Sequence, residues 1–329
     1  MFAKEREAHK KILLVLPTLH AGGSENYALR FIQYSQNLPV IWHVWSANAE
    51  RGDLHNQFHM VDCHIHYGSI GYYHPRRFYR FYRFLQRESF DTVCTFNGNF
   101  GGVALTIARF AGVSYRVAWH RRSTNAFGDN SLKLFFNDLV NRLIRLNATK
   151  ILSNSNYALE QFYKDYWEND KRFKVIPNGV DASLISIKMT QKEARNRLGV
   201  PVDAKIIGNV GRFAPAKNHE TIFKVAAKLI IEHPLDVYFL FCGKFTDSSE
   251  FKARLDEYGI ADRCFPLGLQ ENIAVVYRAL DAFYFPSVTE GQPNALIEAM
   301  LSGLPVLPSN IPPIVEMFPA ERASIAVEP

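Results

Sequence analysis

The chain has 329 residues, which is enough for two domains of ordinary size. Its composition, 47% hydrophobic and 21% charged residues, is typical of a globular protein and excludes a disordered chain. The net charge of +6 is concentrated in the first half, which is compatible with an anionic partner such as a phosphate, a nucleic acid or a membrane surface.

The first half alternates between strand and helix patterns. An apolar run at 12–16 leads into the turn HAGGSEN and predicts a buried strand followed by a helix over 25–38. This run is too short for a signal peptide, and no window approaches the roughly 18 apolar residues of a membrane span. Further strands are expected at 40–46, 64–69, 91–97, 115–120, 150–155 and 174–178. This βαβ alternation predicts a parallel sheet with helices on both faces.

A turn-rich bridge is expected over 177–200, after which the alternation restarts. Strands are predicted at 206–210, 237–242, 263–267, 282–286 and 306–308. Helices are predicted between them at 220–233, 249–258, 273–280 and 293–302. We therefore expect an α/β protein with two Rossmann-like doubly wound domains, 1–180 and 181–329, that face a cleft. Ligands of such sheets bind beyond the carboxyl ends of the strands.

The stretch TEGQPNALIEAM places Glu290 and Glu298 eight positions apart around a predicted helix start. Pro293 suits the first helical position, where its missing N–H costs nothing. Three free backbone amides would then form an anion site, those of Asn294, Ala295 and Leu296. The carboxylates are poor phosphate ligands but good acceptors for hydroxyls, so a sugar nucleotide fits both groups. The alternative is a helix cap at Glu290 and a solvated Glu298.

Two other loops also follow predicted strands. GRFAPAKN carries Arg212 and Lys217, whose cations suit a diphosphate, and the alternative is a solvated loop. In AGGSEN, Gly22 and Gly23 would let the backbone approach a ligand closely. This turn is not GxGxxG, so a nicotinamide-type dinucleotide site is only weakly supported.

The segment HPRRFYRFYRFLQRES, 74–89, predicts a basic amphipathic helix rich in aromatic residues. Such a helix can lie on an anionic membrane, or it can be a surface helix whose aromatic face enters the core, and both can hold at once. No pattern typical of a nucleic-acid-binding module accompanies it. A metal site at His59, Cys63, His64 and His66 is not predicted, because no second pair follows at ligand spacing. The four scattered cysteines favour a reducing, cytoplasmic compartment.

These motifs together resemble the retaining glycosyltransferases of family 4, which have the GT-B fold. The resemblance runs from residue 12 to about 316. The family's E-x7-E signature is matched by Glu290 and Glu298, and its Gly-Arg-x4-Lys element by Arg212 and Lys217. A weaker Gly-Gly-x-Glu loop is matched at 22–25. Family members usually continue with a final helix that returns to the first domain, so the C-terminal crossover is expected to be truncated here.

The resemblance implies a role for each matched residue. Arg212 and Lys217 would hold the donor diphosphate, and Gly22 and Gly23 would approach it from the first domain. Glu298 would bind the ribose, and Glu290 the transferred sugar. His120, at the end of a predicted strand, matches a family histidine beside the reacting carbon, although it could also be an ordinary strand-end histidine. Acceptor contacts are expected from the loops 97–102 and 121–130.

The resemblance implies transfer of a hexose from a nucleotide sugar to a saccharide or lipid-linked acceptor. Capsule, lipopolysaccharide or other cell-surface polysaccharide synthesis would use such a step. No cofactor is expected, and no metal, because the chain has no Asp-x-Asp pair. The enzyme would be cytoplasmic and peripheral on the inner face of the cell membrane. Two alternatives are a non-catalytic sugar-nucleotide-binding subunit and another GT-B enzyme, such as a hydrolase or an epimerase. The two-carboxylate scheme of glycoside hydrolases is disfavoured, because this pair brackets a helix start.

Overall fold

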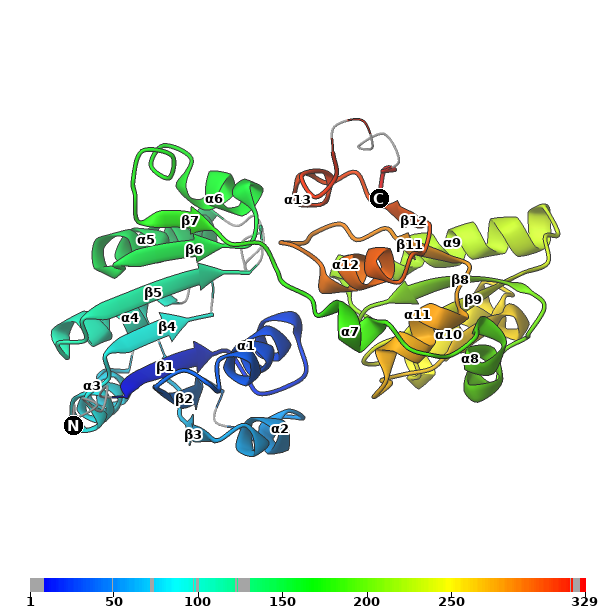
Figure 1. The fold of residues 1–329 in the computed structure, drawn as a ribbon. Coiled ribbons are helices and arrows are strands. Elements are labelled where there is room, and N and C mark those ends of the chain that lie inside the picture. The colour runs from blue at the N-terminus through cyan, green and yellow to red at the C-terminus, as the bar shows by residue number, and fades with distance from the viewer. Residues whose placement is uncertain are drawn as a thin grey trace. The chain divides into compact units, whose positions relative to one another are not determined.

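Two parallel sheets organise the chain, one in each of the units Met1–Pro177 and Asn178–Pro329 (Figure 1). The computed structural model describes residues 9–48, 50–71, 74–96, 98, 101–121, 123, 131–319, 321 and 326–329, with the backbone alone at 131–134. The expected α/β class with two parallel-sheet domains is confirmed.

Unit 1 holds a seven-stranded sheet in the order β3-β2-β1-β4-β5-β6-β7, and its paired strands are parallel. The strands are β1 (Lys10–Leu16), β2 (Val40–Ser46), β3 (Cys63–Tyr67), β4 (Thr92–Thr95), β5 (Tyr115–His120), β6 (Lys150–Ser153) and β7 (Phe173–Val175). The helices are α1 (Gly23–Tyr34), α2 (His55–Met60), α3 (Pro75–Glu88), α4 (Gly101–Phe110), α5 (Ser131–Asn147) and α6 (Asn156–Tyr163).

The apolar run of β1 is buried on both faces of its sheet. Leu13 and Val15 pack into the core that α3 and α4 cover, while Leu14 and Leu16 pack into the core beneath α1 and α2. Successive side chains of a strand point to opposite faces, so a central strand covered by helices on both sides has no polar position. This arrangement explains why the apolar pattern at 12–16 is continuous rather than alternating.

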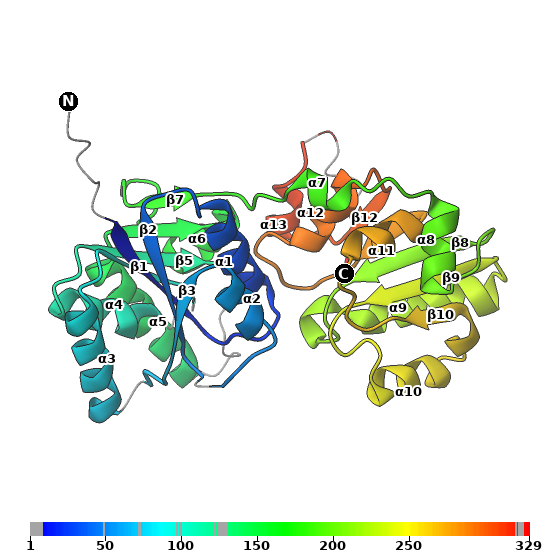
Figure 2. The same cartoon turned by 60° about the horizontal axis from the view of Figure 1, so that its bottom comes forward.

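Unit 2 holds a five-stranded sheet in the order β10-β9-β8-β11-β12, also with parallel pairs. The strands are β8 (Lys205–Val210), β9 (Val237–Cys242), β10 (Cys264–Pro266), β11 (Ala282–Phe285) and β12 (Val306–Pro308). The α-helices are α7 (Ala182–Ile185), α8 (Gln191–Leu198), α9 (His219–Ala227), α10 (Ser249–Glu257), α11 (Ile273–Ala279), α12 (Asn294–Leu301) and α13 (Pro312–Val315). Short helical turns are η2 (Pro215–Lys217), η3 (Lys228–Glu232) and η4 (Ala261–Arg263). Helices α11 and α12 cover one face of this sheet, and α9 and α10 the other (Figure 2).

The turn-rich bridge expected over 177–200 is wrong in part, because α7 and α8 lie within it. Helix α8 begins with a capping box, in which the Thr190 side chain accepts from the Glu193 amide and the Glu193 side chain accepts from the Thr190 amide. Its Ala194 is buried against Val275 and Ala279 of α11. The segment is therefore part of unit 2 rather than a loose connection.

No helix within the described ranges combines the length and the apolar character that crossing a bilayer requires.

Candidate functional site

The two motif loops of unit 2 meet at the carboxyl edge of its sheet. One follows β8 and carries Arg212 and Lys217, and the other follows β11 and carries Glu290. Because β8 and β11 are adjacent parallel strands, their carboxyl ends lie side by side. The amide of Val288 donates to the carbonyl of Ala216 over 3.0 Å and joins the two loops directly.

The loop after β8 is also held by the neighbouring strand end at β9. The Gly211 amide donates to the Cys242 carbonyl over 2.9 Å. Gly243 has a φ of +148°, and a Cβ built there would lie 2.3 Å from the Gly211 carbonyl oxygen. Only a glycine fits such a close approach of two backbones at this φ. Main-chain contacts therefore fix the start of the loop that carries the predicted cations.

Lys217 and Glu290 form an ion pair between the two loops. The Lys217 Nζ lies 2.5 Å from Glu290 Oε1, and the two side chains are 23% and 12% exposed. The ammonium group also lies 5.0 Å from the centre of the Phe285 ring. A cation and a carboxylate predicted to contact different parts of one donor are thus in direct contact with each other.

Arg212, the other predicted cation, is exposed. No hydrogen bond or ion pair to a residue that the structure describes engages its guanidinium group. This group remains available to an anionic ligand at the same edge of the sheet, with the planar fork that matches two phosphate oxygens.

Helix α12 starts one residue later than the sequence indicates, since Pro293 is its N-cap with φ −77° and ψ 117°. No side chain caps this helix start, which supplies the amides of Asn294, Ala295 and Leu296. Asn178 holds the preceding turn: its Nδ2 donates to the Gln292 carbonyl over 2.7 Å and to Asn294 Oδ1 over 2.8 Å, while its amide donates to Gln292 Oε1. Sequence analysis missed this role, because it interpreted Asn178 only as part of the turn-rich bridge over 177–200.

Glu298 lies inside α12 and is 6% exposed. The Tyr277 hydroxyl lies 3.0 Å from Glu298 Oε2 and 3.1 Å from the Ala295 carbonyl, so it can donate to either. A buried carboxylate is stable only when hydrogen-bonded, and Tyr277 on α11 provides one such partner. The alternative of a solvated Glu298 is therefore wrong.

His219 lies two residues beyond Lys217 and is 2% exposed. Rings of Phe213, Phe241 and Phe251 surround it, and neither ring nitrogen has a hydrogen-bond partner. Burial, with a smaller contribution from Lys217, lowers the pKa of His219 from 6.5 to about 4. The imidazole is thus neutral at pH 7.

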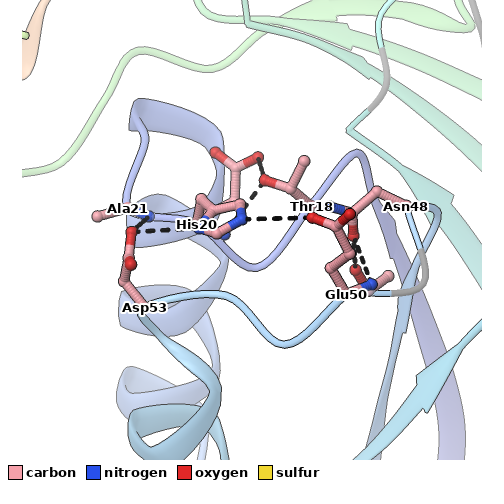
Figure 3. Close-up of polar contacts among 8 residues, drawn as sticks. Thr18, His20, Ala21, Asn48, Glu50 and Asp53 are labelled. Carbon is pink, nitrogen blue, oxygen red and sulfur yellow. Dashed lines mark hydrogen bonds and ion pairs between the residues drawn. The ribbon is translucent and has the colours of Figure 1, made fainter.

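In unit 1, the loop after β1 precedes Gly22, the N-cap of α1. Asp53 Oδ2 accepts from the Ala21 amide over 3.2 Å and lies 3.3 Å from His20 Nδ1 (Figure 3). The Thr18 hydroxyl donates to Glu25 Oε1 over 3.3 Å. Sequence reasoning missed Asp53, which holds this loop from the segment after β2. A Cβ built at Gly23 would meet no atom within 4 Å, so the backbone there is open.

His120 ends β5 as predicted, but it is fully buried. Its Nε2 lies 2.9 Å from the Tyr163 hydroxyl, and its Nδ1 has no partner. Burial lowers its pKa to about 4, so the ring is neutral at pH 7. His120 is thus the last residue of its strand and is buried there. Its contact with a sugar stays a prediction.

The loops expected to contact the acceptor fall largely outside the described residues, which omit 97, 99, 100, 122 and 124–130. Arg121 is described, and its guanidinium carbon lies 3.7 Å from the centre of the Tyr27 ring. Among the residues with described positions, no three His, Cys, Asp or Glu side chains are grouped closely enough to hold a metal ion.

Comparison with known proteins covers both units. Residues 21–184 match the model described as Glycosyltransferase Family 4, and residues 190–329 match the model described as Glycosyl transferases group 1. The chain is 26% identical to the capsular polysaccharide biosynthesis glycosyltransferase CapH of Staphylococcus aureus, over 92% of this chain and 81% of CapH. It is 30% identical to the UDP-Gal:alpha-D-GlcNAc-diphosphoundecaprenol alpha-1,3-galactosyltransferase of Escherichia coli, over 70% of this chain and 60% of that protein. The crystal structure of Anabaena HepE with UDP and glucose has a similar fold, with a TM-score of 0.77 at 18% identity, covering 94% of this chain and 83% of HepE.

Proposed function

Because this chain belongs to glycosyltransferase family 4, we propose that it transfers a hexose from a nucleotide sugar with retention of configuration and without a metal ion. The observation that supports this use of unit 2 is the ion pair of Lys217 with Glu290 in front of the uncapped start of α12. A cation, free amides and carboxylates at one sheet edge suit a diphosphate flanked by hydroxylated rings.

In the proposed reaction, Arg212, Lys217 and the amides at the start of α12 bind the donor diphosphate. The bond between the anomeric carbon and the β-phosphate oxygen breaks, and these groups stabilise the charge that develops on the leaving nucleotide. The acceptor oxygen bonds to the anomeric carbon on the same face, and its proton passes to the β-phosphate. Glu290 would orient hydroxyls of the transferred sugar, and Glu298 those of the ribose. Gly22, Gly23 and His120 of unit 1 stay predicted contacts of the donor.

Metal independence is inferred from the charges of the chain itself. The sequence has no Asp-x-Asp pair. Such a pair would bind a divalent cation that in turn holds the diphosphate of a nucleotide sugar. Arg212 and Lys217 supply two fixed positive charges where such a cation would be needed. Transfer that persists undiminished in a chelator supports this proposal, and transfer that requires an added divalent cation contradicts it.

The acceptor that we propose is a saccharide, either free or linked to a lipid, in the synthesis of a cell-surface polysaccharide. The Staphylococcus relative is named for capsule biosynthesis, and the Escherichia relative for transfer to a diphosphoundecaprenol-linked sugar. Structural similarity to HepE, solved with UDP, makes a uridine diphosphate sugar the first donor to test.

We further propose a cytoplasmic enzyme that associates with the inner face of the membrane through α3. Phe81, Phe84 and Leu85 of this helix are buried, whereas its arginines are exposed. The aromatic face thus packs inward and leaves a cationic surface outward. Sedimentation with anionic vesicles should show binding that salt weakens, and binding that is absent or indifferent to salt contradicts this proposal.

The transfer itself is tested in two steps. A screen of nucleotide sugars for thermal stabilisation identifies the donor, and transfer to a lipid-linked acceptor is then followed with wild type and Glu290→Ala. We expect Glu290→Ala to lose transfer and to keep most donor binding. A non-catalytic subunit would bind without transferring in either form, and a hydrolase or epimerase would consume the donor without any acceptor.

A further inference from the structure

A groove in unit 1 lies between α3 and the carboxyl ends of the edge strand β3 and its neighbour β2. It has a volume of about 580 Å³. Among the residues that the structure describes, its lining consists of three arginines, four aromatic or imidazole rings and one aliphatic residue: Arg80, Arg83, Arg87, Trp45, His66, Tyr67, Phe84 and Ile65. The described lining includes no carboxylate, and the nearby Glu88 pairs with Arg87, so the groove carries a net positive charge.

Three polar atoms on the strand side of the groove are engaged within the protein. The Trp45 Nε1 donates to the Gly68 carbonyl over 2.6 Å, His66 Nε2 lies 2.9 Å from His43 Nδ1, and the Tyr67 hydroxyl lies 2.5 Å from His55 Nδ1. These three contacts leave mainly ring faces on the strand wall. The charged hydrogen-bond donors of the described lining are the arginines on the helix side.

On the helix side, Arg80 and Arg83 are exposed and have no hydrogen bond or ion pair with any residue in the described part of the chain. Arg87 is one turn further along and contacts Glu88, with 3.1 Å between Nε and Oε1. Residues at i, i+3 and i+7 lie on one face of a helix, so the three guanidinium groups form one stripe along the groove.

Gly68, just beyond β3, gives Arg80 room against the strand wall. A Cβ built at Gly68 would lie 2.9 Å from Arg80 Nη2 and 2.6 Å from the Trp45 ring. The absence of a side chain there lets a guanidinium group and an indole come close to the same backbone position. The missing side chain at Gly68 thus makes room for Arg80 beside the groove.

We propose that this groove binds the phosphate monoester of an anionic lipid headgroup. Guanidinium forks match the terminal oxygens of a phosphate, and the ring faces of the strand wall suit the uncharged part of a headgroup. A lipid is favoured over a soluble phosphate by Tyr79, which is 63% exposed on α3 between Arg76 and Arg83. An exposed aromatic ring among cations is typical of a membrane interface. This inference builds on the proposed membrane association and makes it specific.

The test compares two vesicle types of equal surface charge, phosphatidylcholine with phosphatidic acid and phosphatidylcholine with phosphatidylglycerol. Only the first offers a phosphate monoester. Wild type should bind phosphatidic acid vesicles about tenfold more tightly, which is the effect of one additional charge-assisted hydrogen bond. Arg80→Gln with Arg83→Gln should abolish this preference.

A matched control removes the same charge from the same helix outside the groove. Arg76→Gln with Arg77→Gln should weaken binding to both vesicle types and keep the preference. Equal binding of wild type to both types, or equal loss of the preference in both variants, overturns the proposal. Inorganic phosphate is added at the same bulk concentration as the lipid phosphate. Its complete displacement of the protein from phosphatidic acid vesicles would indicate a soluble ligand instead. Unchanged thermal unfolding of the variants shows that they fold, and no donor or transfer enters the assay, so its outcome is independent of the catalytic proposal.

Discussion

Lys217 Nζ and Glu290 Oε1 lie 2.5 Å apart, although the two residues belong to loops that follow different strands. The carboxylate is therefore paired with the same ammonium group that we propose binds the donor diphosphate. In the proposed mechanism, the donor diphosphate replaces the Glu290 carboxylate as the partner of the Lys217 ammonium group. The carboxylate can then accept hydrogen bonds from hydroxyls of the sugar.

This relationship predicts opposite effects of one substitution on binding and on turnover. Glu290→Gln removes the competing charge, so the nucleoside diphosphate should bind about two- to tenfold more tightly, while transfer falls by at least about a hundredfold. Calorimetric titration and a transfer assay measure the two effects. Lys217→Ala should weaken both, whereas Lys192→Ala, which breaks an exposed pair with Asp203, should change neither. Weaker diphosphate binding by Glu290→Gln would contradict the competition.

Tyr277 should control donor affinity through Glu298. Tyr277→Phe removes the hydroxyl that lies 3.0 Å from the buried carboxylate, which should cost about 1–3 kcal/mol of unfolding free energy. If Glu298 binds the ribose, its misplacement raises the KM for the donor more than it lowers kcat. Chemical unfolding and steady-state kinetics measure these quantities. Tyr238→Phe in the same unit is the control, and equal changes in both variants would show that the Glu298 contact is unimportant.

Asn178 should act on the helix start of α12 without touching the donor. Asn178→Ala removes the donors to the Gln292 carbonyl and to Asn294 Oδ1, so the turn before the helix loses its anchor. We expect about tenfold weaker diphosphate binding, because each lost hydrogen bond contributes about 1 kcal/mol. Titration with the nucleoside diphosphate measures this loss. As a control, Asn196→Ala at an exposed position of α8 should bind the nucleoside diphosphate like wild type. Normal diphosphate binding by Asn178→Ala would show that Asn178 has no role in the site.

His219 should make unit 2 less stable in mild acid. Its pKa is about 4 in the folded chain and ordinarily 6.5, so the unfolded state binds the proton first as the pH falls. Stability present at pH 7 is therefore lost between about pH 6.5 and pH 4, by up to about 3 kcal/mol for this residue. Urea unfolding at pH 7 and pH 5 should show a smaller difference for His219→Leu than for wild type. The exposed His233→Leu should retain the full difference.

Much of the fold could be predicted from the sequence, because hydrophobic burial leaves a local pattern. The strands at 40–46, 115–120, 237–242 and 306–308 were predicted with the bounds that the structure shows. Parallel sheets with helices on both faces require continuous apolar runs, and these are visible without any tertiary information. The helices α7 and α8 were missed because the Pro, Gly and polar residues around them were interpreted as a turn-rich bridge.

The site was predictable in its residue types but not in its contacts. Asn178 and Gln292 are 114 positions apart, and no local pattern connects an asparagine in one turn with an amide in another. The pair of Lys217 with Glu290 depends likewise on β8 and β11 being neighbours in the sheet. His120 likewise contacts Tyr163 of α6, which lies 43 positions further along the chain.

The backbone contact between Gly243 and Gly211 fixes the start of the loop that carries Arg212 through main-chain atoms. Further along, two side chains hold the loop, because Phe213 packs against Phe251 and Lys217 pairs with Glu290. Arg212 and Pro215 are exposed and contribute to none of these side-chain anchors. The sequence can therefore vary at these two positions while the loop keeps its path.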